Sequence, residues 1–273
     1  MTELDEKYIW PAYEKDNYQC IDTGAKSQLC YIFFSSNGLY FPDEEKVFQE
    51  QIIQKDRYEW KWVVSNSQIP MIAGRIIYVR DVFKDWYSKG ISRENNTIEK
   101  SLQLLKNLTE GYRIITVGSS AGGYMAVLTA VMLKAELCFN FSGQYVLREQ
   151  GDRPYRNITK LLENFTGSIM YFVPAYCEQD QFQYNMIKDI PCIKEVLFNG
   201  HKHAETMFAG NMSYIVDKDQ EQLYKIYKTY KGKKVDKIKF LFDTVPFGKA
   251  ICIMKKEIGS FINRRMGKYV NDI

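Results

Sequence analysis

Histidine is almost absent from this chain, since His201 and His203 are its two representatives among 273 residues. The six cysteines are scattered, with no CxxC pair, and neither histidine lies beside one of them. A zinc site is therefore not expected, and we predict no metal ligands. Most of the cysteines fall inside apolar runs, which predicts reduced, buried thiols in a cytoplasmic protein rather than a disulfide framework.

Long apolar runs and linkers are missing as well. No stretch approaches the roughly 20 residues of a membrane-spanning helix, and residues 1–13, which are acidic and aromatic, lack the basic and apolar parts of a secretory signal. No repeat and no Pro/Gly/Ser-rich segment divides the chain, so we expect one domain over residues 1–273. The net charge of +4 is too small to indicate nucleic-acid binding.

The pattern of apolar residues predicts the fold class. Short runs rich in β-branched and aromatic residues predict strands at 29–34, 60–65, 75–79, 112–117, 136–141, 168–176 and 192–198. Helical spacing occurs between them at 44–55, 93–108, 121–133, 181–188 and 204–214. This alternation favours an α/β fold with a mostly parallel central sheet and helices on both faces. Functional side chains should then gather at the carboxyl ends of the strands.

Two segments lie outside this alternation. Residues 143–167 should form a small cap above the sheet, and they carry Arg148, Arg153 and Arg156. Residues 217–273 are predicted to be a basic helical C-terminal extension of two helices, because seven lysines face a single acid between Lys225 and Lys239. The second helix has an apolar stripe, which either packs on the body with its lysines in solvent or docks on a membrane or a protein partner. The stripe consists of Phe247, Ala250, Ile251, Met254, Ile258, Phe261 and Ile262.

Ser120 is the predicted nucleophile. It stands between an apolar strand and a helix of small residues, with Gly118 and Gly122 two positions away on either side. These glycines allow the close backbone approach of a sharp strand-to-helix turn, and the amide of Ala121 would donate to an oxyanion. Tight packing of a glycine-rich turn is the structural alternative. No lysine follows Gly122-Gly123, so a phosphate-binding P-loop is disfavoured.

The base and the acid of a serine triad can also be assigned. Both histidines follow a late predicted strand. His203 is favoured as the base because it opens the helical run that begins at Ala204, and His201 is the alternative. A surface turn without a catalytic role is the competing interpretation. Asp180, which follows the strand between serine and histidine, is the predicted acid, with Glu178 as the alternative. Asp180 could instead only cap the next helix.

Three loops are expected to complete the site. Ser36 or Asn37, after the strand at 29–34, should give the second oxyanion donor. Trp86 and Tyr87 would either contact a sugar or peptide substrate or anchor their loop to the core. Arg148, Arg153 and Arg156 of the cap would favour an anionic substrate, or equally face solvent.

The turn at 118–122, the later Asp180 and the histidine pair resemble the α/β-hydrolase superfamily over residues 28–215. The resemblance implies a Ser-Asp-His triad and acyl-ester chemistry without a cofactor. More loosely, the short cap and the loop from Arg80 to Tyr87 look like hydrolase-fold proteins of bacterial surface-polysaccharide pathways, some of which transfer acyl groups. The His-Gly oxyanion signature of lipases is replaced here by Ser-Ser-Asn-Gly at 35–38.

Two functions follow as expectations. The first is a serine hydrolase or acyltransferase. Its substrate would be a small-molecule or glycan ester, namely an acylated sugar or polysaccharide precursor. The second is a non-catalytic hydrolase-fold component of a glycan assembly complex, docked through its basic C-terminal helix, since a fold alone proves no activity.

Overall fold

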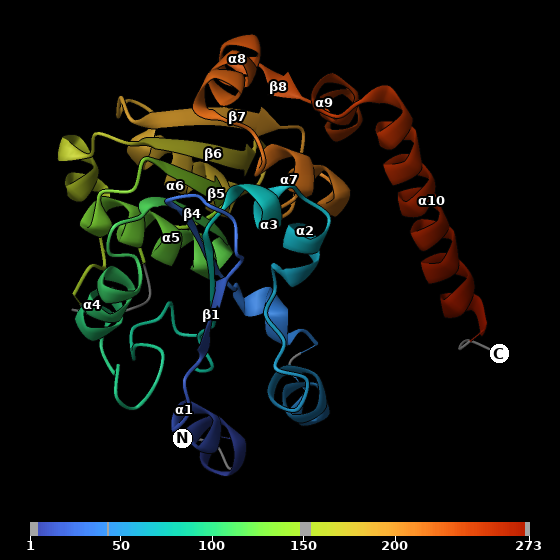
Figure 1. Cartoon of the computed structure of the whole chain (residues 1–273). Coiled ribbons are helices and arrows are strands. Elements are labelled where there is room, and N and C mark those ends of the chain that lie inside the picture. Colours follow the sequence, from blue (N-terminus) through green and yellow to red (C-terminus); the bar gives the residue numbers. More distant parts are fainter. Residues whose placement is uncertain (1–4, 43, 148–153, 271–273) are drawn as a thin grey trace.

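Eight strands form one sheet in the order β1-β3-β2-β4-β5-β6-β7-β8 (Figure 1). The computed structural model describes residues 5–42, 44–147 and 154–270. Strand β1 pairs antiparallel with β3, and the other neighbouring pairs are parallel. The strands are β1 (Tyr18–Asp22), β2 (Leu29–Phe34), β3 (Arg75–Val79), β4 (Arg113–Ser119), β5 (Leu137–Phe141), β6 (Ser168–Pro174), β7 (Ile193–Phe198) and β8 (Lys234–Val235).

Helices connect most of the strands. The α-helices are α1 (Trp10–Tyr13), α2 (Lys61–Ser65), α3 (Ile69–Ile72), α4 (Ile98–Leu108), α5 (Ser120–Leu133), α6 (Glu178–Ile187), α7 (Ala209–Ile215), α8 (Gln220–Tyr230), α9 (Lys237–Thr244) and α10 (Phe247–Val270). Shorter turns of 3-10 or π type are η1 (Asp5–Ile9), η2 (Asn37–Tyr40), η3 (Val47–Ile53) and η4 (Thr159–Asn164).

The sheet is covered on both faces. Along β2, Cys30, Ile32 and Phe34 belong to one apolar core together with residues of α4, α5 and α6. Tyr31 and Phe33 belong to a second core with residues of α2, α3, α7 and α8. Alternate side chains of a strand point to opposite faces of a sheet, so each face has its own helical layer. The predicted α/β class, with a mostly parallel sheet and helices on both faces, is confirmed.

Small residues bring α5 close to the sheet. A Cβ atom added at Gly122 would overlap with the carbonyl oxygen of Phe34 at the end of β2. One added at Gly123 would overlap with Gly143, which follows β5. Glycine is therefore required at these contacts, and the start of α5 lies directly against the carboxyl ends of two strands.

One predicted strand is wrong. Residues 61–65 form α2, in which Val63 and Val64 are buried and Trp62 is exposed. A short apolar run does not distinguish a strand from one buried turn of helix, since either can bury adjacent side chains. The side chain of Trp60 donates from Nε1 to the Phe34 carbonyl at 2.8 Å, and this contact fixes the segment above the end of β2. The other six predicted strands are present, within a few residues at their ends.

Several boundaries differ from the predictions. Helix α4 begins at Ile98, five residues after the predicted start, because the Thr97 hydroxyl caps it by accepting from the amide of Lys100. The helix predicted at 204–214 begins at Ala209, since Ala204 has a left-handed φ of 59° that a helix cannot contain. Strands β1 and β8 were not predicted. The first is a largely exposed edge strand and the second has two residues.

The C-terminal segment is only in part an extension. Leu223, Tyr227 and Tyr230 of α8 and Phe240 of α9 are buried in the core on one sheet face, and β8 pairs with β7. The predicted all-helical extension over 217–273 is therefore wrong for its first part, and it contains three helices. The first turns of α10 pack on α7 and α9 through Ala250, Ile253 and Met254, and Figure 1 shows the rest of α10 standing away from the body. None of the described helices is long and apolar enough to cross a membrane.

The cap predicted at 143–167 lies in part outside the described residues, and two of the six cysteines are not buried. Val146 and Asn157 form an antiparallel bridge on either side of the segment that holds Arg148 and Arg153, and these two arginines lie outside the described residues. The six cysteines are free, as predicted, but Cys20 and Cys252 are exposed rather than buried.

Candidate active site

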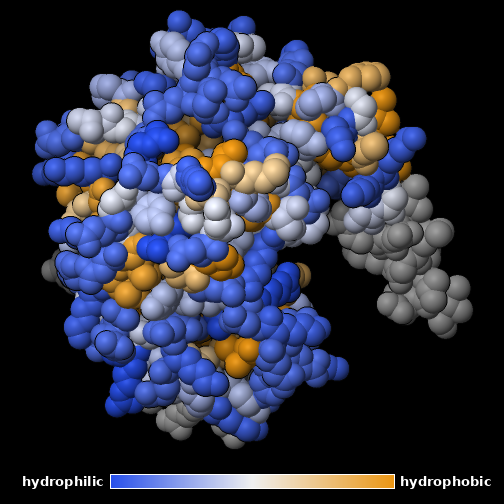
Figure 2. Space-filling model, viewed as in Figure 1, coloured by the Kyte–Doolittle hydropathy of each residue, from blue (hydrophilic) through white to orange (hydrophobic). Residues whose placement is uncertain are grey.

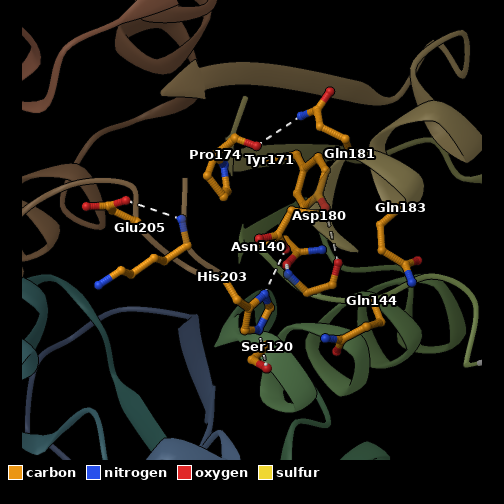
Figure 3. A network of polar contacts seen from close by, with 12 residues as sticks. Ser120, Asn140, Gln144, Tyr171, Pro174, Asp180, Gln181, Gln183, His203 and Glu205 are labelled. Atoms are coloured by element: carbon orange, nitrogen blue, oxygen red, sulfur yellow. Dashed lines mark hydrogen bonds and ion pairs between the residues drawn. The ribbon is translucent and has the colours of Figure 1, made fainter. Parts of the chain in front are cut away.

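Ser120, His203 and Asp180 form a hydrogen-bonded chain (Figure 3). His203 Nε2 lies 2.8 Å from Ser120 Oγ, and His203 Nδ1 lies 2.9 Å from Asp180 Oδ1. The three residues follow β4, β7 and β6, which run parallel in the sheet. Parallel strands end at one edge, so side chains that are 83 and 23 residues apart in the sequence meet there.

Ser120 occupies the turn between β4 and α5. Its φ of 49° lies in the left-handed region, which costs a residue with a side chain about 1–3 kcal/mol. The preceding Ser119 is extended, so the chain turns sharply from strand to helix at Ser120. In the middle of α5, Tyr124, Met125 and Ala126 are fully buried, and their packing holds this turn in place.

Asp180 lies in the first turn of α6, and its side chain is 1% exposed. The N-cap of α6 is Cys177, which makes no side-chain capping hydrogen bond. Asp180 therefore does not cap the helix, and its carboxylate bonds to His203 instead. Glu178, the alternative acid, is exposed and lines a neighbouring cavity.

The two histidines have different surroundings. His203 is 30% exposed and faces Asp180 and Ser120. The exposed ring of His201 stacks on Tyr176 with centroids 4.8 Å apart. The carboxylate of Glu205 accepts from the amides of His201 and Lys202 at 2.9 and 3.3 Å and so fixes this loop (Figure 3).

Two of the three predicted oxyanion donors have amides suited to the role. Ala121 and Asn37 lie in the first turns of α5 and η2, where backbone N–H groups have no acceptor within the helix. The amide of Ser36 instead donates to the carboxylate of Glu59, and the Ser36 hydroxyl donates to the same carboxylate at 2.9 Å. Of the two alternatives after β2, the structure therefore favours Asn37.

Glu59 is a residue that the sequence did not single out. Besides Ser36, the hydroxyl of Ser119 lies 3.5 Å from its Oε1, so this carboxylate joins the loop after β2 to the residue before the nucleophile. Burial raises the pKa of Glu59, and the hydrogen bonds from Ser36 and Ser119 oppose that shift. The acid stands before α2, which was predicted as a strand, so the sequence held no signal for it.

The loop after β3 is built around Asp81. Its buried carboxylate accepts from the amides of Phe83, Asp85 and Tyr87 at 3.0, 2.7 and 2.8 Å. Burial raises the pKa of Asp81 to about 6. Trp86 and Tyr87 have left-handed φ values of 50° and 60°, which the three hydrogen bonds maintain.

Trp86 and Tyr87 have separate roles in this loop. Tyr87 is fully buried and its hydroxyl donates to the Ser35 carbonyl at 2.7 Å, so the anchoring interpretation applies to it and substrate contact does not. Trp86 donates from Nε1 to Gln144 Oε1 at 3.1 Å and lines a cavity of about 730 Å³. Arg156 donates from Nε to the Leu147 carbonyl at 3.0 Å, which supports the cap backbone.

The cavity is connected with the hydrogen-bonded chain through α6 and Gln144, and Ser120, His203 and Asp180 are not among its described lining residues. Six of its described lining residues belong to α6, the helix that carries Asp180. Gln144 lines it from the loop after β5, and Figure 3 shows the amide of Gln144 pointing toward Ser120. Sequence analysis missed Gln144, although its place after a predicted strand could have indicated it. Within residues 5–42, 44–147 and 154–270 no group of three or more His, Cys, Asp or Glu side chains could hold a metal ion.

The sheet order, the left-handed serine between β4 and α5, and an acid and a histidine after later strands define an α/β-hydrolase fold. Three solved structures are similar to this chain. MenH from S. aureus has a TM-score of 0.46 and 11% identity over 78% of this chain and 99% of its own. Est1E from Butyrivibrio proteoclasticus has a TM-score of 0.47 and 12% identity over 77% and 93%.

The third is the capsule O-acetyltransferase of Neisseria meningitidis serogroup A, with a TM-score of 0.44 and 12% identity over 79% of this chain and 92% of its own. No protein-family model matches the sequence, and no curated protein matches it.

Proposed function

We propose that this protein is a serine hydrolase or acyltransferase that cleaves an ester through an acyl-enzyme on Ser120. The observation that carries the proposal is the pair of hydrogen bonds, 2.8 and 2.9 Å long, that joins Ser120 to His203 and His203 to Asp180. A serine hydroxyl becomes a nucleophile when an adjacent base removes its proton, and the base works best when a third group orients it.

The reaction has two steps. Ser120 Oγ bonds to the ester carbonyl carbon while its proton passes to His203 Nε2, and the amides of Ala121 and Asn37 stabilise the oxyanion. The carbon–oxygen bond to the alcohol then breaks, and His203 returns the proton to the leaving alcohol. Water, or a hydroxyl of a second sugar, attacks the acyl-enzyme with His203 again as base. Asp180 holds the Nδ1–H and stabilises the imidazolium.

An acylated sugar or polysaccharide precursor is the proposed ester. The support is the Trp86 ring and the amide side chains in the cavity lined by α6 and Gln144, because indole rings pack on the apolar faces of sugars and amides pair with hydroxyls. Hydrolysis and transfer share the same first step, and they differ in whether water or a sugar hydroxyl reaches the acyl-enzyme.

Covalent labelling with a fluorophosphonate probe tests the proposal. We expect labelling of the wild type and of His201→Ala, and none of Ser120→Ala or His203→Ala. His201→Ala is the matched control, since it removes the same side chain two residues away without touching the hydrogen-bonded chain. A folded wild type that takes up no probe, or His203→Ala labelled at the wild-type rate, contradicts the proposal.

A second candidate is a docking role for α10. Phe247 is 71% exposed and Ile258 is 51% exposed. Apolar residues gather where α9 meets α10 in Figure 2. Six basic residues accompany two acids from Lys249 to Ile273, a composition suited to an anionic membrane or protein surface. Salt-sensitive binding to phosphatidylglycerol vesicles that is lost on deleting residues 249–273 would support this role, and unchanged binding by the truncated chain would exclude it.

A further inference from the structure

The cavity lined by α6 and Gln144 has the size of a substrate site. Its volume of about 730 Å³ lies within the range of about 300–1,000 Å³ typical of small-molecule sites. Glu178 and Gln179, which line it, directly precede Asp180 in α6. Gln144 comes three residues after Phe141, the strand residue paired with Ser119 beside the nucleophile. Gln144, which lines the cavity and points toward Ser120 in Figure 3, is the residue that connects the cavity with the serine.

The walls of the cavity are rich in neutral polar groups. Besides Trp86 and Phe182 they include amide side chains and one carboxylate, that of Glu178, and among the described lining residues there is no lysine or arginine. An amide both donates and accepts hydrogen bonds, which matches a hydroxyl group better than a carboxylate or a phosphate. The amides are Gln144, Gln179, Gln181, Gln183 and Asn185.

Some of these amides already have partners in the protein. Gln183 accepts from the amides of Tyr145 and Val146 and donates to the Val146 carbonyl, so it holds the backbone of the cavity wall. Gln181 donates to the Pro174 carbonyl at 2.9 Å. These two residues are structural parts of the site.

Gln144 has an unused donor. It is 5% exposed, and its Oε1 accepts from the indole of Trp86 at 3.1 Å. Its Nε2 donates no hydrogen bond to any residue that the structure describes, and the amide points toward Ser120 in Figure 3. This donor is therefore available to an acceptor on a ligand that enters the cavity.

We propose that Gln144 determines the alcohol specificity of the ester, by donating from Nε2 to a hydroxyl oxygen of a neutral sugar unit while Trp86 packs against the same ring. The inference rests on the proposed ester chemistry of Ser120. The indole holds the Gln144 carbonyl, so the orientation of the amide is set before a substrate binds. A site that offers a fixed donor to a hydroxyl disfavours an alcohol that lacks one, because the donor then remains unpaired.

Two acetyl esters with different alcohols test this role. We expect Gln144→Leu to lower kcat/KM for 6-O-acetylglucose about tenfold and to leave that for p-nitrophenyl acetate within about twofold, as expected for the loss of one hydrogen bond. Gln144→Glu, which keeps the length and the acceptor for Trp86 but has no donor, should show the same selective loss. Gln103 is an exposed amide on α4, and Gln103→Leu is the matched control, which should leave kcat/KM unchanged for both esters.

Other outcomes overturn the inference. Equal losses for both esters would make Gln144 a structural residue, and unchanged kinetics would remove it from the site. Faster cleavage of an acetylated glucuronic acid than of 6-O-acetylglucose would contradict a neutral sugar. If wild type cleaves neither ester and takes up no fluorophosphonate, the proposed function itself fails. Saturation-transfer NMR with methyl glucoside then still tests whether the cavity binds a sugar. Binding that Gln144→Leu abolishes would support the role of Gln144, and no binding to wild type would contradict it.

Discussion

The carboxylate of Glu59 accepts hydrogen bonds from both the backbone amide and the hydroxyl of Ser36. One acid thereby fixes the loop that leads into η2, where the amide of Asn37 is proposed as an oxyanion donor. Trp60 adds a bond from its indole to the Phe34 carbonyl, so this fixation extends to the end of β2.

Replacing Glu59 should therefore affect both stability and activity. We expect Glu59→Leu to lower the free energy of unfolding by about 2 kcal/mol, because the buried amide of Ser36 loses its acceptor. Glu59→Gln keeps one acceptor oxygen and should lose less. Urea denaturation measures both changes, with Glu110→Leu, an exposed acid, as the control. Equal stability of Glu59→Leu and wild type would mean that the carboxylate does not hold the loop.

Asp81 should make stability depend on pH. Its pKa is about 6 in the folded protein against an ordinary value of 3.8, so the folded state holds the proton more tightly than the unfolded state. The free energy of unfolding therefore falls as pH rises from about 4 to about 6, by at most about 3 kcal/mol from this group. Its stabilising effect is complete at the acidic end of that window and lost at the upper end.

Asp81→Asn cannot ionise and removes this contribution. The difference in unfolding free energy between wild type and Asp81→Asn should thus decrease between pH 4 and pH 6 and level off above. The variant should be less stable than wild type at neutral pH, since one amide oxygen cannot serve three backbone donors. Denaturant titrations at several pH values measure the difference, and a difference independent of pH would contradict the assignment.

Gly122 is predicted to tolerate no side chain. In Gly122→Ala the added methyl group would overlap with the Phe34 carbonyl oxygen, and the backbone would have to move. We expect a loss of about 1–3 kcal/mol in unfolding free energy together with slower fluorophosphonate labelling, because α5 carries Ser120. Gly248→Ala is the control, since no atom lies within 4 Å of a Cβ there. Wild-type labelling of Gly122→Ala would refute the close contact.

Asp180→Asn should separate orientation from fold. Asparagine has nearly the same shape, but it no longer accepts the Nδ1–H of His203 and favours the wrong tautomer, which in other serine triads costs about 10⁴-fold in kcat. We expect a similar loss for p-nitrophenyl acetate with an unchanged circular dichroism spectrum. Asp189→Asn, the same substitution at an exposed acid just after α6, should keep wild-type activity. Loss in both variants would indicate general damage to α6.

The sequence predicted the nucleophile turn and its partners because these depend on local chemistry. Ser120 is flanked by glycines that only a tight turn explains, and a chain with so few histidines leaves few candidates for a base. The fold class followed from apolar strands such as 29–34 that alternate with helices. The sequence left two choices open. His203 or His201 depends on the loop held by Glu205, and Asp180 or Glu178 depends on which of them faces inward from α6.

Other parts of the site depend on contacts distant in sequence. Glu59 and Ser36 lie 23 residues apart, and Trp86 and Gln144 lie 58 apart, so neither pair has a local pattern. The segment 60–65 was misassigned because its apolar run is too short to show a period. The edge strand β1 was missed because it pairs with β3 alone and is largely exposed. Its residues therefore show no apolar pattern.

Helix α6 carries Asp180 on its inner side and presents Glu178, Gln181, Phe182 and Asn185 to the cavity. The proposed acid and one wall of the proposed alcohol site thus share one helix. Substitutions at Glu178, Phe182 and Asn185 would then alter the fit of the alcohol while the backbone that holds Asp180 stays in place. Substrate range can accordingly diversify in descendants of this chain, or in the laboratory, along a single helix and without rebuilding the catalytic machinery.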